Sequence, residues 1–438
     1  MKKLKRLFCM LIVVMVFAAS CISTSAITYD YNETLESDTV LLVNMDTGIP
    51  VLEKNADKVR YPASLTKIMT YIVACENIDD LYNTRIEIKQ EVLDPLLGTG
   101  SSMSGLDYKI GESLTVEDLL YCLMVSSGND AAMVLADYVG GGSIEKFVSM
   151  MNAKAKELGC KNTNFVNPHG LHDDNHYSTA YDLYTIASYA LTLPLFSQIT
   201  DTATYYCEGD DYPLVTTNYL IDVNRGGDYF YTYAKGIKTG TTDEAGRCLI
   251  TTGIADGYAY MCICMGAPYP DNGYNAAMTD AKGLLRWALL NLELDRMITV
   301  ETPVSEIPVN FTNQLDTLDL YPEETVYAIL PKDREDSDVV REPNIPESID
   351  APIKKGDIVG TVTVYYKGEA VQTVNLVAGE DVEKSGFAYV MHMFKSVITS
   401  WIFWVAFVFA IVLIVAYVKL VSSVRSHNKR RVKKYRRM

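Results

Sequence analysis

The sequence predicts an α/β domain, more narrowly α+β, followed by a small all-β domain and a C-terminal transmembrane helix. Up to about residue 296, helical and strand patterns are mixed along the chain. From 297 to 385, short strand patterns alternate with Pro and Gly turns. Residues 397–418 form an apolar run without a charged residue. At 438 residues the chain is also too long for one ordinary domain.

Residues 1–26 have the pattern of a signal peptide. A basic start leads into an apolar run from Leu7 to Ala19, and small residues follow as far as Ala26. We expect cleavage after Ala26. Cys21 ends the lipobox-like string Ala18-Ala19-Ser20-Cys21, so lipidation at Cys21 is the open alternative.

Residues 27–296 are the predicted first domain. Two strand patterns, Thr39–Asn44 and Pro50–Lys54, flank Asp46-Thr47-Gly48 and predict a hairpin. We expect a helix to begin at Ser64, because an apolar run starts at Ile68. Further helices are expected over Thr115–Val125, Asp130–Tyr138, Ile144–Leu158, Thr179–Leu191 and Asn275–Leu290. Further strands are expected over Lys235–Lys238, Arg247–Ile254 and Tyr258–Met265.

Residues 297–385 are the predicted second domain, which is rich in strands and carries no evident catalytic constellation. Its strands are expected over Val304–Phe311, Thr325–Leu330, Ile358–Tyr366 and Ala370–Leu376. Residues 386–396 are predicted to be a short linker to the membrane segment.

Residues 397–418 are predicted to cross a membrane. At about 1.5 Å per residue, a helix of this length spans the hydrocarbon layer. Trp401 and Trp404 lie near its start, and nine Lys and Arg residues follow within 419–438. By the positive-inside rule, this basic tail is cytoplasmic and the preceding body lies outside the cell.

Charge and cysteine usage exclude some classes of protein. The formal net charge is −16, yet residues 1–6 carry +4 and residues 419–438 carry +9, which leaves about −29 between them. An acidic body of this kind argues against nucleic-acid binding. Seven cysteines follow the expected cleavage site without clustered spacing, which favours buried thiols over a disulfide framework.

Three motifs stand in order along the first domain: Ser64-Leu65-Thr66-Lys67, Ser127-Gly128-Asn129 and Lys238-Thr239-Gly240. The first pattern also occurs by chance at Ser143 and Ser426. Ser143 follows three glycines and is expected to cap an ordinary helix with Lys146 on its exposed face, whereas Ser426 lies in the basic tail.

The motif at Ser64 differs from these chance matches in its chemistry. A helix start there places Ser64 at the positive end of the helix, with Lys67 one turn on and on the same face. A lysine titrates at about 10.4 in water, so it acts as a base only when its pKa is lowered. Desolvation, the helix N-terminus and a second cation, Lys238, would all lower that pKa. The pattern therefore indicates a serine nucleophile with a lysine base.

The chain resembles the serine D-Ala-D-Ala carboxypeptidases, which are the low-molecular-weight penicillin-binding proteins. The resemblance is carried by Ser-Leu-Thr-Lys-Ile-Met-Thr, Ser-Gly-Asn-Asp-Ala-Ala and Gly-Ile-Lys-Thr-Gly-Thr-Thr-Asp-Glu-Ala-Gly, and also by Phe165–Leu171 and His176–Ala180. It covers about residues 27 to 385. It implies a penicillin-recognising transpeptidase/β-lactamase-like domain that trims D-alanine from peptidoglycan stem peptides, is acylated by β-lactam antibiotics and needs no cofactor.

The resemblance implies three catalytic residues. Ser64 would be the nucleophile, Lys67 its base, and Ser127 the group that passes a proton to the leaving amine. The backbone N–H groups of Ser64 and Thr241 would form the oxyanion hole. The family often has a histidine or an aromatic residue at the position of Thr241, so substrate preference or pH profile is expected to differ here.

The resemblance also implies a substrate-binding set. Asn129 would hold a backbone amide of the substrate and position the lysine base. Lys238 and the Thr239 hydroxyl would bind the terminal carboxylate, which every carboxypeptidase substrate carries. Arg247 lies near enough in the sequence to assist, with a surface arginine as the open alternative. The complete expected set is Asn129, Lys238, Thr239, Gly240 and Thr241.

A metal site is not predicted. His169, His172 and His176 are three of the five histidines, and with Asp173 and Asp174 they resemble a zinc-ligand cluster. Their spacing falls in a loop broken by Pro and Gly rather than on one helical face.

Three other functions share these motifs. A β-lactamase would need a glutamate for deacylation, usually in E-x-x-L-N, and no such string lies between Ser127 and Lys238. A penicillin sensor would normally carry its binding domain after the membrane segments. A non-catalytic cell-wall scaffold would have no need for all three motifs to be intact.

Overall fold

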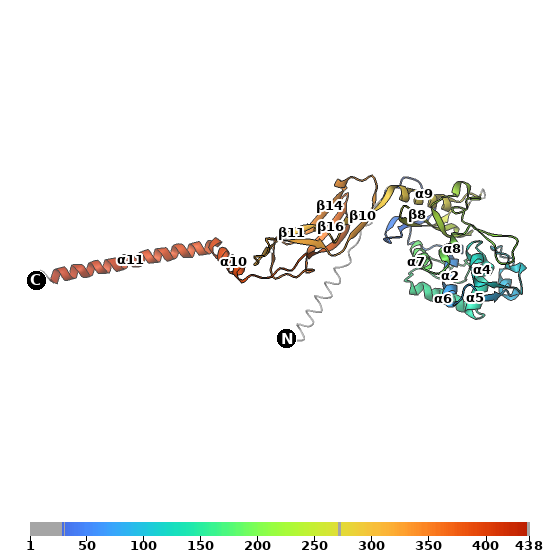
Figure 1. Ribbon diagram of the computed structural model, residues 1–438, viewed down its shortest axis with the longest axis horizontal. Coiled ribbons are helices and arrows are strands. Elements are labelled where there is room, and N and C mark those ends of the chain that lie inside the picture. Colours follow the sequence, from blue (N-terminus) through green and yellow to red (C-terminus); the bar gives the residue numbers. More distant parts are fainter. Residues whose placement is uncertain (1–28, 30, 270–272, 436–438) are drawn as a thin grey trace. The chain divides into compact units, whose positions relative to one another are not determined.

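The computed structural model describes residues 29, 31–269 and 273–435 (Figure 1). The described chain forms two compact units. One contains the residues up to Asp295 together with Tyr327–Glu335, and the other contains Arg296–Val326 and the residues from Asp336 on. The predicted signal peptide, with its alternatives at Cys21 and Ala26, lies outside the described residues.

A five-stranded antiparallel sheet with the order β2-β1-β9-β8-β7 forms the centre of the first unit. The strands are β1 (Thr39–Asn44), β2 (Pro50–Lys54), β7 (Ala234–Thr242), β8 (Gly246–Ala255) and β9 (Tyr258–Ala267). The predicted hairpin of β1 and β2 is confirmed, as is that of β8 and β9. Strand β7 carries Lys238-Thr239-Gly240 and lies at the edge of the sheet.

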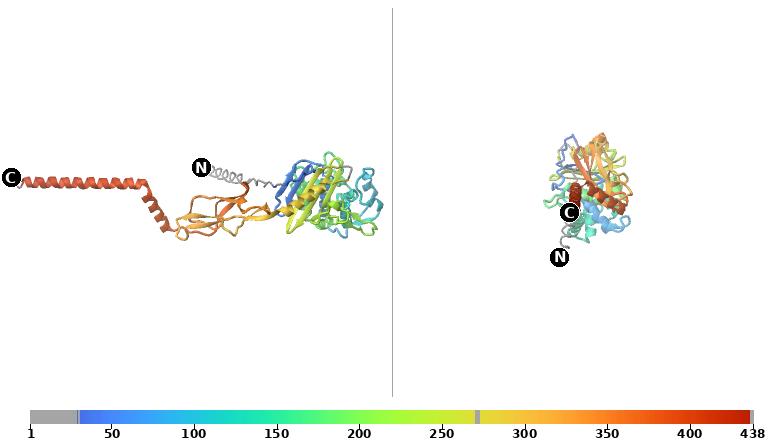
Figure 2. Two further views of the ribbon diagram at one scale, coloured as in Figure 1. Left: turned by 90° about the horizontal axis from the view of Figure 1, so that it is seen from above. Right: turned by 90° about the vertical axis from the view of Figure 1, so that its left-hand side faces the viewer.

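Helices cover both faces of this sheet (Figure 2). Along β1, Leu41 and Val43 face a core made with the helices between β2 and β7, whereas Val40 and Leu42 face α9. This alternation is the period of two that a strand imposes on its side chains. The helices on the first face are α2 (Lys67–Asn77), α4 (Val116–Met124), α5 (Asn129–Gly140), α6 (Ile144–Glu157), α7 (Ala180–Ala190) and α8 (Phe196–Thr200), and α9 (Ala276–Asn291) covers the other.

Side-chain caps explain why most predicted helices begin where they do. The Thr115 hydroxyl accepts from the Asp118 N–H at 3.1 Å, and the Thr179 hydroxyl accepts from the Asp182 N–H at 3.1 Å. Ser143 caps α6 in the same way, which confirms that its motif match is structural.

Two predictions near the motifs need correction. The regular α-helix begins at Lys67, because Ser64 lies in a 3₁₀ turn, η1 (Ala63–Thr66), that precedes it. Strand β7 is nine residues long rather than the four expected, because pairing with β8 extends it through weakly apolar residues as far as Thr242. Short elements of this unit were not expected: β3 (Arg85–Glu87), α3 (Gln90–Leu93), β4 (Ser113–Thr115), β5 (Thr204–Tyr205), β6 (Leu214–Val215) and the 3₁₀ turns η2 (Asp94–Leu96), η3 (Leu106–Tyr108) and η4 (Gly227–Tyr229).

The second unit is built on a six-stranded sheet with the order β14-β16-β17-β12-β11-β15. Its strands are β11 (Ser305–Asn310), β12 (Thr317–Pro322), β14 (Val339–Asn344), β15 (Ile349–Asp350), β16 (Ile358–Tyr366) and β17 (Glu369–Ala378). Strand β14 escaped prediction because it is largely exposed and contains Pro343. A separate two-stranded sheet pairs β10 (Leu292–Ile298) with β13 (Val326–Pro331), of which Leu292–Asp295 and Tyr327–Pro331 belong to the first unit. In the second unit, η5 (Asp336–Asp338) precedes β14.

Two helices end the described chain. Helix α10 (Gly386–Thr399) occupies the segment predicted to be a linker, and the Ser385 hydroxyl caps its first turn. Helix α11 (Trp401–Tyr435) contains a stretch, Trp401–Ser423, that is long and apolar enough to cross a membrane, with a mean hydropathy of 2.7. The expected span over 397–418 is therefore displaced, because residues 397–399 end α10 and Ser400 separates the two helices.

The seven cysteines of the described residues are free thiols, and five of them are buried. This confirms the expectation of buried thiols rather than a disulfide framework.

Candidate functional site

The turn that carries Ser64 is fixed from two sides. The Thr66 hydroxyl donates to the Ala63 carbonyl at 2.8 Å and lies 2.7 Å from His176 Nε2. His176 Nδ1 accepts from the Val166 N–H at 3.3 Å, so the proton resides on Nε2 and is donated to Thr66. Burial lowers the pKa of His176 to about 4, so the ring is neutral at physiological pH and holds this turn as a structural donor.

Lys67 is fully buried and its amine lies at the centre of the three motifs. The Nζ atom lies 2.9 Å from Ser64 Oγ, 2.6 Å from Asn129 Oδ1 and 2.8 Å from the His169 carbonyl oxygen. A neutral amine has two N–H donors and one lone pair. Two of these neighbours only accept, so both donors are used and the lone pair is left for the Ser64 hydroxyl. The geometry suits proton transfer from serine to lysine.

The electrostatics favour the neutral form of Lys67. Burial is the largest cause and lowers its pKa well below the usual value, and the charge of Lys238 lowers it further. Asp130 opposes this shift because a negative charge favours the protonated amine.

The second motif occupies the sharp connection between α4 and α5. Ser127 is buried with a φ of 62°, and Asn129 begins α5 and reaches Lys67. Gly128 lies tightly between them, since a Cβ there would lie 2.5 Å from Asp130 Oδ1 and 2.7 Å from Ser104 Oγ, so these side chains would have to shift. Among the described residues, no hydrogen bond joins Ser127 to Ser64 or Lys67.

The third motif lies on β7 directly beside the Ser64 turn. A Cβ at Gly240 would lie 2.9 Å from the Pro62 carbonyl oxygen and 3.1 Å from the Ser64 nitrogen, so only glycine allows this approach. This approach of Gly240 also brings the next residue, Thr241, close to the Ser64 turn. Lys238 is 1% exposed, and burial lowers its pKa to about 7.

Thr217 is a site residue that the sequence did not reveal. Its hydroxyl contacts the hydroxyl of Thr239, and its N–H donates to the Val125 carbonyl at 3.3 Å. Asn218 follows and donates to the Gly236 carbonyl at 2.6 Å, which fixes this segment along β7. The string Thr216-Thr217-Asn218 is common in loops and gives no signal of its own.

The histidine loop also supports the Ser64 turn. Asn167 Oδ1 accepts from the Gly170 N–H at 2.6 Å, and the Thr70 hydroxyl donates to the Pro168 carbonyl at 2.5 Å. Gly170, with a φ of 90°, presses on the turn, because a Cβ there would lie 1.9 Å from the Ala63 carbonyl oxygen. The sequence predicted neither this contact nor the hydrogen bond from Lys67 to the His169 carbonyl oxygen.

The three histidines that resemble a zinc-ligand cluster in the sequence, His169, His172 and His176, make different contacts in the structure. Burial lowers the pKa of His169 to about 3, and its Nδ1 accepts from the Leu171 N–H at 3.2 Å. His176 holds the Ser64 turn, and His172 packs edge-on against Tyr61 at 4.6 Å between ring centroids.

Arg247 lies opposite Thr241 in the register of β7 and β8. Its guanidinium stacks 4.5 Å from the ring centroid of Tyr269. The described structure shows no ion pair of Arg247 with a carboxylate, and its expected assistance in substrate binding stays a prediction.

Serine enzymes with a lysine base and a K-T-G strand form one class, the penicillin-recognising acyl-transfer enzymes, and the fold and motif set place this chain in it. Residues 25–269 match the family model described as D-alanyl-D-alanine carboxypeptidase, and residues 293–384 match that described as penicillin-binding protein 5, C-terminal domain. The chain belongs to the D-alanyl-D-alanine carboxypeptidase family. It is a serine peptidase with that activity.

Relatives and solved structures agree with this membership. The chain is 33% identical over 355 residues to D-alanyl-D-alanine carboxypeptidase DacF of Bacillus subtilis, covering 80% of this chain and 87% of that protein. It is 28% identical over 362 residues to DacA of Escherichia coli, covering 81% and 85%. Penicillin-binding protein 5 from Haemophilus influenzae superposes with a TM-score of 0.63 and 27% identity, covering 81% of this chain and all of that one.

Proposed function

We propose that Ser64 attacks the carbonyl of the penultimate D-alanine in a peptide ending in D-Ala-D-Ala. An ester bond forms between Ser64 Oγ and that carbonyl, the peptide C–N bond breaks, and the terminal D-alanine leaves. Water then hydrolyses the ester and restores the serine. The observation that carries this proposal is the position of Lys67 Nζ, 2.9 Å from Ser64 Oγ with both of its donors used elsewhere.

The same residues account for the protons. Lys67 takes the proton of the Ser64 hydroxyl as the ester forms, and Ser127 passes a proton to the leaving amine. Asn129 positions Lys67 through the 2.6 Å bond. The backbone N–H groups of Ser64 and Thr241 bind the developing oxyanion, and the close approach of Gly240 to the Ser64 turn supports this pairing.

We assign recognition of the terminal carboxylate to residues of β7. Lys238 supplies the charge, and the Thr239 hydroxyl, held by Thr217, supplies a hydrogen bond. A cation is required here because the substrate of a carboxypeptidase ends in a carboxylate. The solved structure of the Streptomyces K15 DD-transpeptidase superposes with a TM-score of 0.54 and 28% identity, covering 60% of this chain and all of that one. Transfer to an amine instead of water is thus the alternative second step.

The membrane placement is part of the proposal. Helix α11 anchors the chain, and the Lys and Arg residues beyond Val418 make its C-terminal end cytoplasmic. The carboxypeptidase unit then faces the cell wall, where stem peptides ending in D-Ala-D-Ala and β-lactam antibiotics are met. Protease added to intact cells would then digest the carboxypeptidase unit and spare a tag at the C-terminus, and the reverse pattern would overturn this orientation.

The experiment uses the full-length chain in detergent, a fluorescent penicillin and a pentapeptide ending in D-Ala-D-Ala. The wild-type protein is expected to be labelled and to release D-alanine, and Ser64→Ala is expected to do neither. Ser143→Ala is the matched control, because it alters a chance copy of the same motif. Labelling of the Ser64→Ala variant would overturn the assignment of Ser64 as the nucleophile. Labelling without D-alanine release favours a sensor or scaffold, and rapid turnover of penicillin favours a β-lactamase.

A further inference from the structure

Two buried thiols contact each other below the turn that carries Ser127. Cys122 lies near the end of α4 and Cys207 lies in the loop between β5 and β6, and their Sγ atoms are 3.8 Å apart. Cys122 is 1% exposed and Cys207 is 4% exposed. A disulfide bond has an S–S distance of about 2.0 Å, so the two sulfurs have to approach by about 1.8 Å to form one.

A second pair of thiols at the same separation is not suited to a disulfide. Cys262 and Cys264 are also 3.8 Å apart between Sγ atoms, but they occupy alternate positions of β9. Alternate residues of a strand lie about 6.8 Å apart, and their side chains leave the backbone in the same direction. Disulfides need Cβ atoms within about 4.5 Å of each other, and pairing with β1 and β8 fixes β9 on both sides. Cys122 and Cys207 escape this constraint because they come from two separate segments.

The backbone near Cys122 and Cys207 is already held in place for a bond between them. The ring of Tyr205 stacks on that of Tyr121 with 3.5 Å between the centroids, and the Tyr205 hydroxyl donates to Asp118 at 2.8 Å. These contacts attach the start of the loop to α4 on the side where the thiols lie. Rotation of the two cysteine side chains, rather than movement of α4, therefore closes the remaining distance.

Cys207 is the thiol that a soluble oxidant reaches first. The next residue, Glu208, is exposed, and two ion pairs hold this loop to its neighbours, Arg85 with Glu208 and Lys109 with Asp210. Ion pairs at a surface contribute little to stability, so this loop opens locally without unfolding of the whole unit.

We propose that Cys122 and Cys207 form a disulfide outside the cell by exchange with a low-molecular-weight disulfide. The Cys207 thiolate attacks one sulfur of that molecule, an S–S bond forms to Cys207, and the first small thiol leaves. Cys122 then gives up its proton and attacks Cys207 Sγ, and the second small thiol leaves. Two protein thiols are thus oxidised, and one small disulfide is reduced to two thiols. The location outside the cell rests on the proposed function.

The order of these two steps follows from the surroundings of Cys122. The contact with Cys207 and burial raise the pKa of the Cys122 thiol well above its usual value. Cys122 therefore reacts slowly with oxidants in solution. It attacks once a mixed disulfide on Cys207 lies beside it, because the two sulfurs are then held together within one chain.

The disulfide joins two segments that each carry a residue of the site. The Cys122 carbonyl oxygen accepts from the Gly128 N–H at 2.9 Å, within the turn that presents Ser127. The segment after Cys207 continues through β6 to Thr217, which contacts Thr239. A bond between residues 85 positions apart lowers the chain entropy of the unfolded state. It therefore stabilises the carboxypeptidase unit and keeps these two segments together.

The test treats the full-length enzyme in detergent with oxidised glutathione, alkylates the remaining thiols and maps the peptides without reduction. The wild-type enzyme is expected to give a linked peptide that contains Cys122 and Cys207. Relative to the reduced enzyme, the thermal midpoint of the carboxypeptidase unit is expected to rise by about 5–10 °C. Penicillin labelling of the oxidised enzyme is expected to stay within about twofold of the reduced enzyme.

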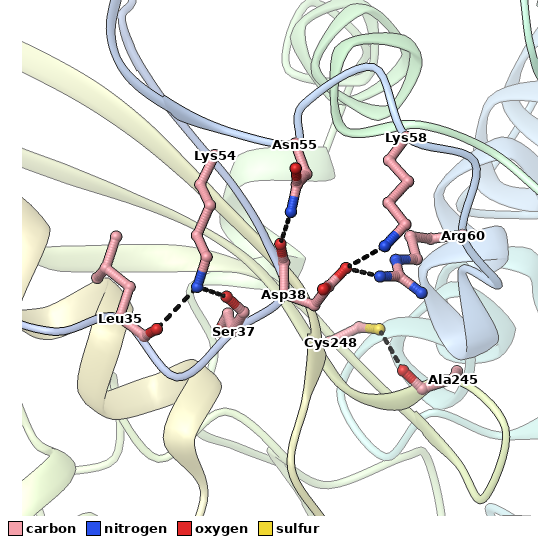
Figure 3. Close-up of polar contacts among 9 residues, drawn as sticks. All are labelled: Leu35, Ser37, Asp38, Lys54, Asn55, Lys58, Arg60, Ala245 and Cys248. Atoms are coloured by element: carbon pink, nitrogen blue, oxygen red, sulfur yellow. Dashed lines mark hydrogen bonds and ion pairs between the residues drawn. The ribbon is translucent and has the colours of Figure 1, made fainter.

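The variant Cys207→Ala is expected to lose both the linked peptide and the rise in the thermal midpoint. Cys122→Ala is expected to do the same and serves as the second variant if the first folds poorly. The matched control is Cys248→Ala. Cys248 is also buried, but its thiol donates to the Ala245 carbonyl at 3.7 Å (Figure 3). This control is expected to keep the linked peptide and the rise.

Glutathione that stays bound to Cys207, a linkage of Cys122 to another cysteine, or an unchanged thermal midpoint overturns the proposal. A loss of more than tenfold in penicillin labelling on oxidation also overturns it, because the bond would then distort the site. Failure of the proposed function is a separate result: the reduced enzyme would neither be labelled by penicillin nor release D-alanine, whether or not the disulfide forms.

Discussion

Replacing Gly170 by alanine tests whether the histidine loop holds the proposed nucleophile, Ser64, in place. Gly170 has a φ of 90°, and a Cβ there would lie 1.9 Å from the Ala63 carbonyl oxygen and 3.0 Å from the Ser64 nitrogen. Both neighbours are backbone atoms, so no side-chain rotation relieves the contact. An ordinary contact needs at least 3.4 Å, so the loop or the Ser64 turn must move by about 1.5 Å.

The expected magnitudes follow from this displacement. A non-glycine residue in the left-handed region costs about 1–2 kcal/mol, and forcing extra volume into a packed site costs about 1–3 kcal/mol. A misplacement of about 1 Å in a catalytic arrangement lowers the rate about 100-fold. We therefore expect Gly170→Ala to lose about 2–5 kcal/mol of unfolding free energy and at least 100-fold in kcat/KM.

The assay measures thermal unfolding and D-alanine release for the full-length enzyme. Gly159→Ala is the matched control: its φ is 86°, close to that of Gly170, but nothing lies within 4 Å of the added Cβ. The control is expected to lose the backbone cost of about 1–2 kcal/mol and to keep its kcat/KM. The difference between the two variants isolates the contact with the Ser64 turn.

The reasoning is refuted if Gly170→Ala retains kcat/KM within about threefold of wild type. It is also refuted if Gly159→Ala loses activity to the same extent, because the loss would then come from backbone strain alone. Thermal unfolding of both variants shows whether a loss of rate reflects a displaced turn or a chain that has not folded.

Three further predictions concern the charges and hydroxyls around Lys67 and Lys238. As pH rises through about 7, Lys238 loses its proton in the free enzyme, so kcat/KM should fall while kcat changes less; an unchanged kcat/KM up to pH 9 contradicts this. Thr217→Val should raise KM about five- to tenfold with little change in kcat, and Thr217→Ser should restore it, because one hydrogen bond to Thr239 is lost and regained. Asp130→Asn should shift the acid limb of the pH–rate profile to lower pH, because Asp130 raises the pKa of Lys67, and should lower stability by about 2–4 kcal/mol, measured by denaturant unfolding.

Local signals were enough to predict much of the fold. The ends of the helices capped by Thr115, Ser143 and Thr179 were predicted within a residue or two. Both signals, the capping residue and the apolar periodicity, depend only on residues close together in the sequence. The β1–β2 and β8–β9 hairpins followed from turn residues between apolar runs. Helix α10 was missed because residues 386–396 were interpreted as a linker to the membrane segment, although they form an amphipathic helix.

The motif residues were predicted from the sequence, whereas the residues that contact and support them were not. Thr217 contacts Thr239 although 22 residues separate them in the sequence, and Gly170 contacts Ala63 although more than 100 residues separate them. Asp130 shapes the site by accepting from the Ser104 and Leu106 N–H groups at 2.8 and 3.1 Å. Such contacts depend on how loops meet in three dimensions, and no spacing rule along the chain encodes them.

In the proposed mechanism, one site holds two buried lysines, Lys67 as the base and Lys238 as the cation. Lys67 is desolvated and also repelled by Lys238, whereas burial alone lowers the pKa of Lys238 to about 7. The proton therefore leaves Lys67 first, because its neutral form relieves both penalties and satisfies Asn129 and the His169 carbonyl. In the proposed mechanism, the charge that remains on Lys238 binds the substrate carboxylate. When that carboxylate binds, it stabilises the charge on Lys238 and weakens its repulsion of Lys67, so the base becomes stronger once substrate is in place.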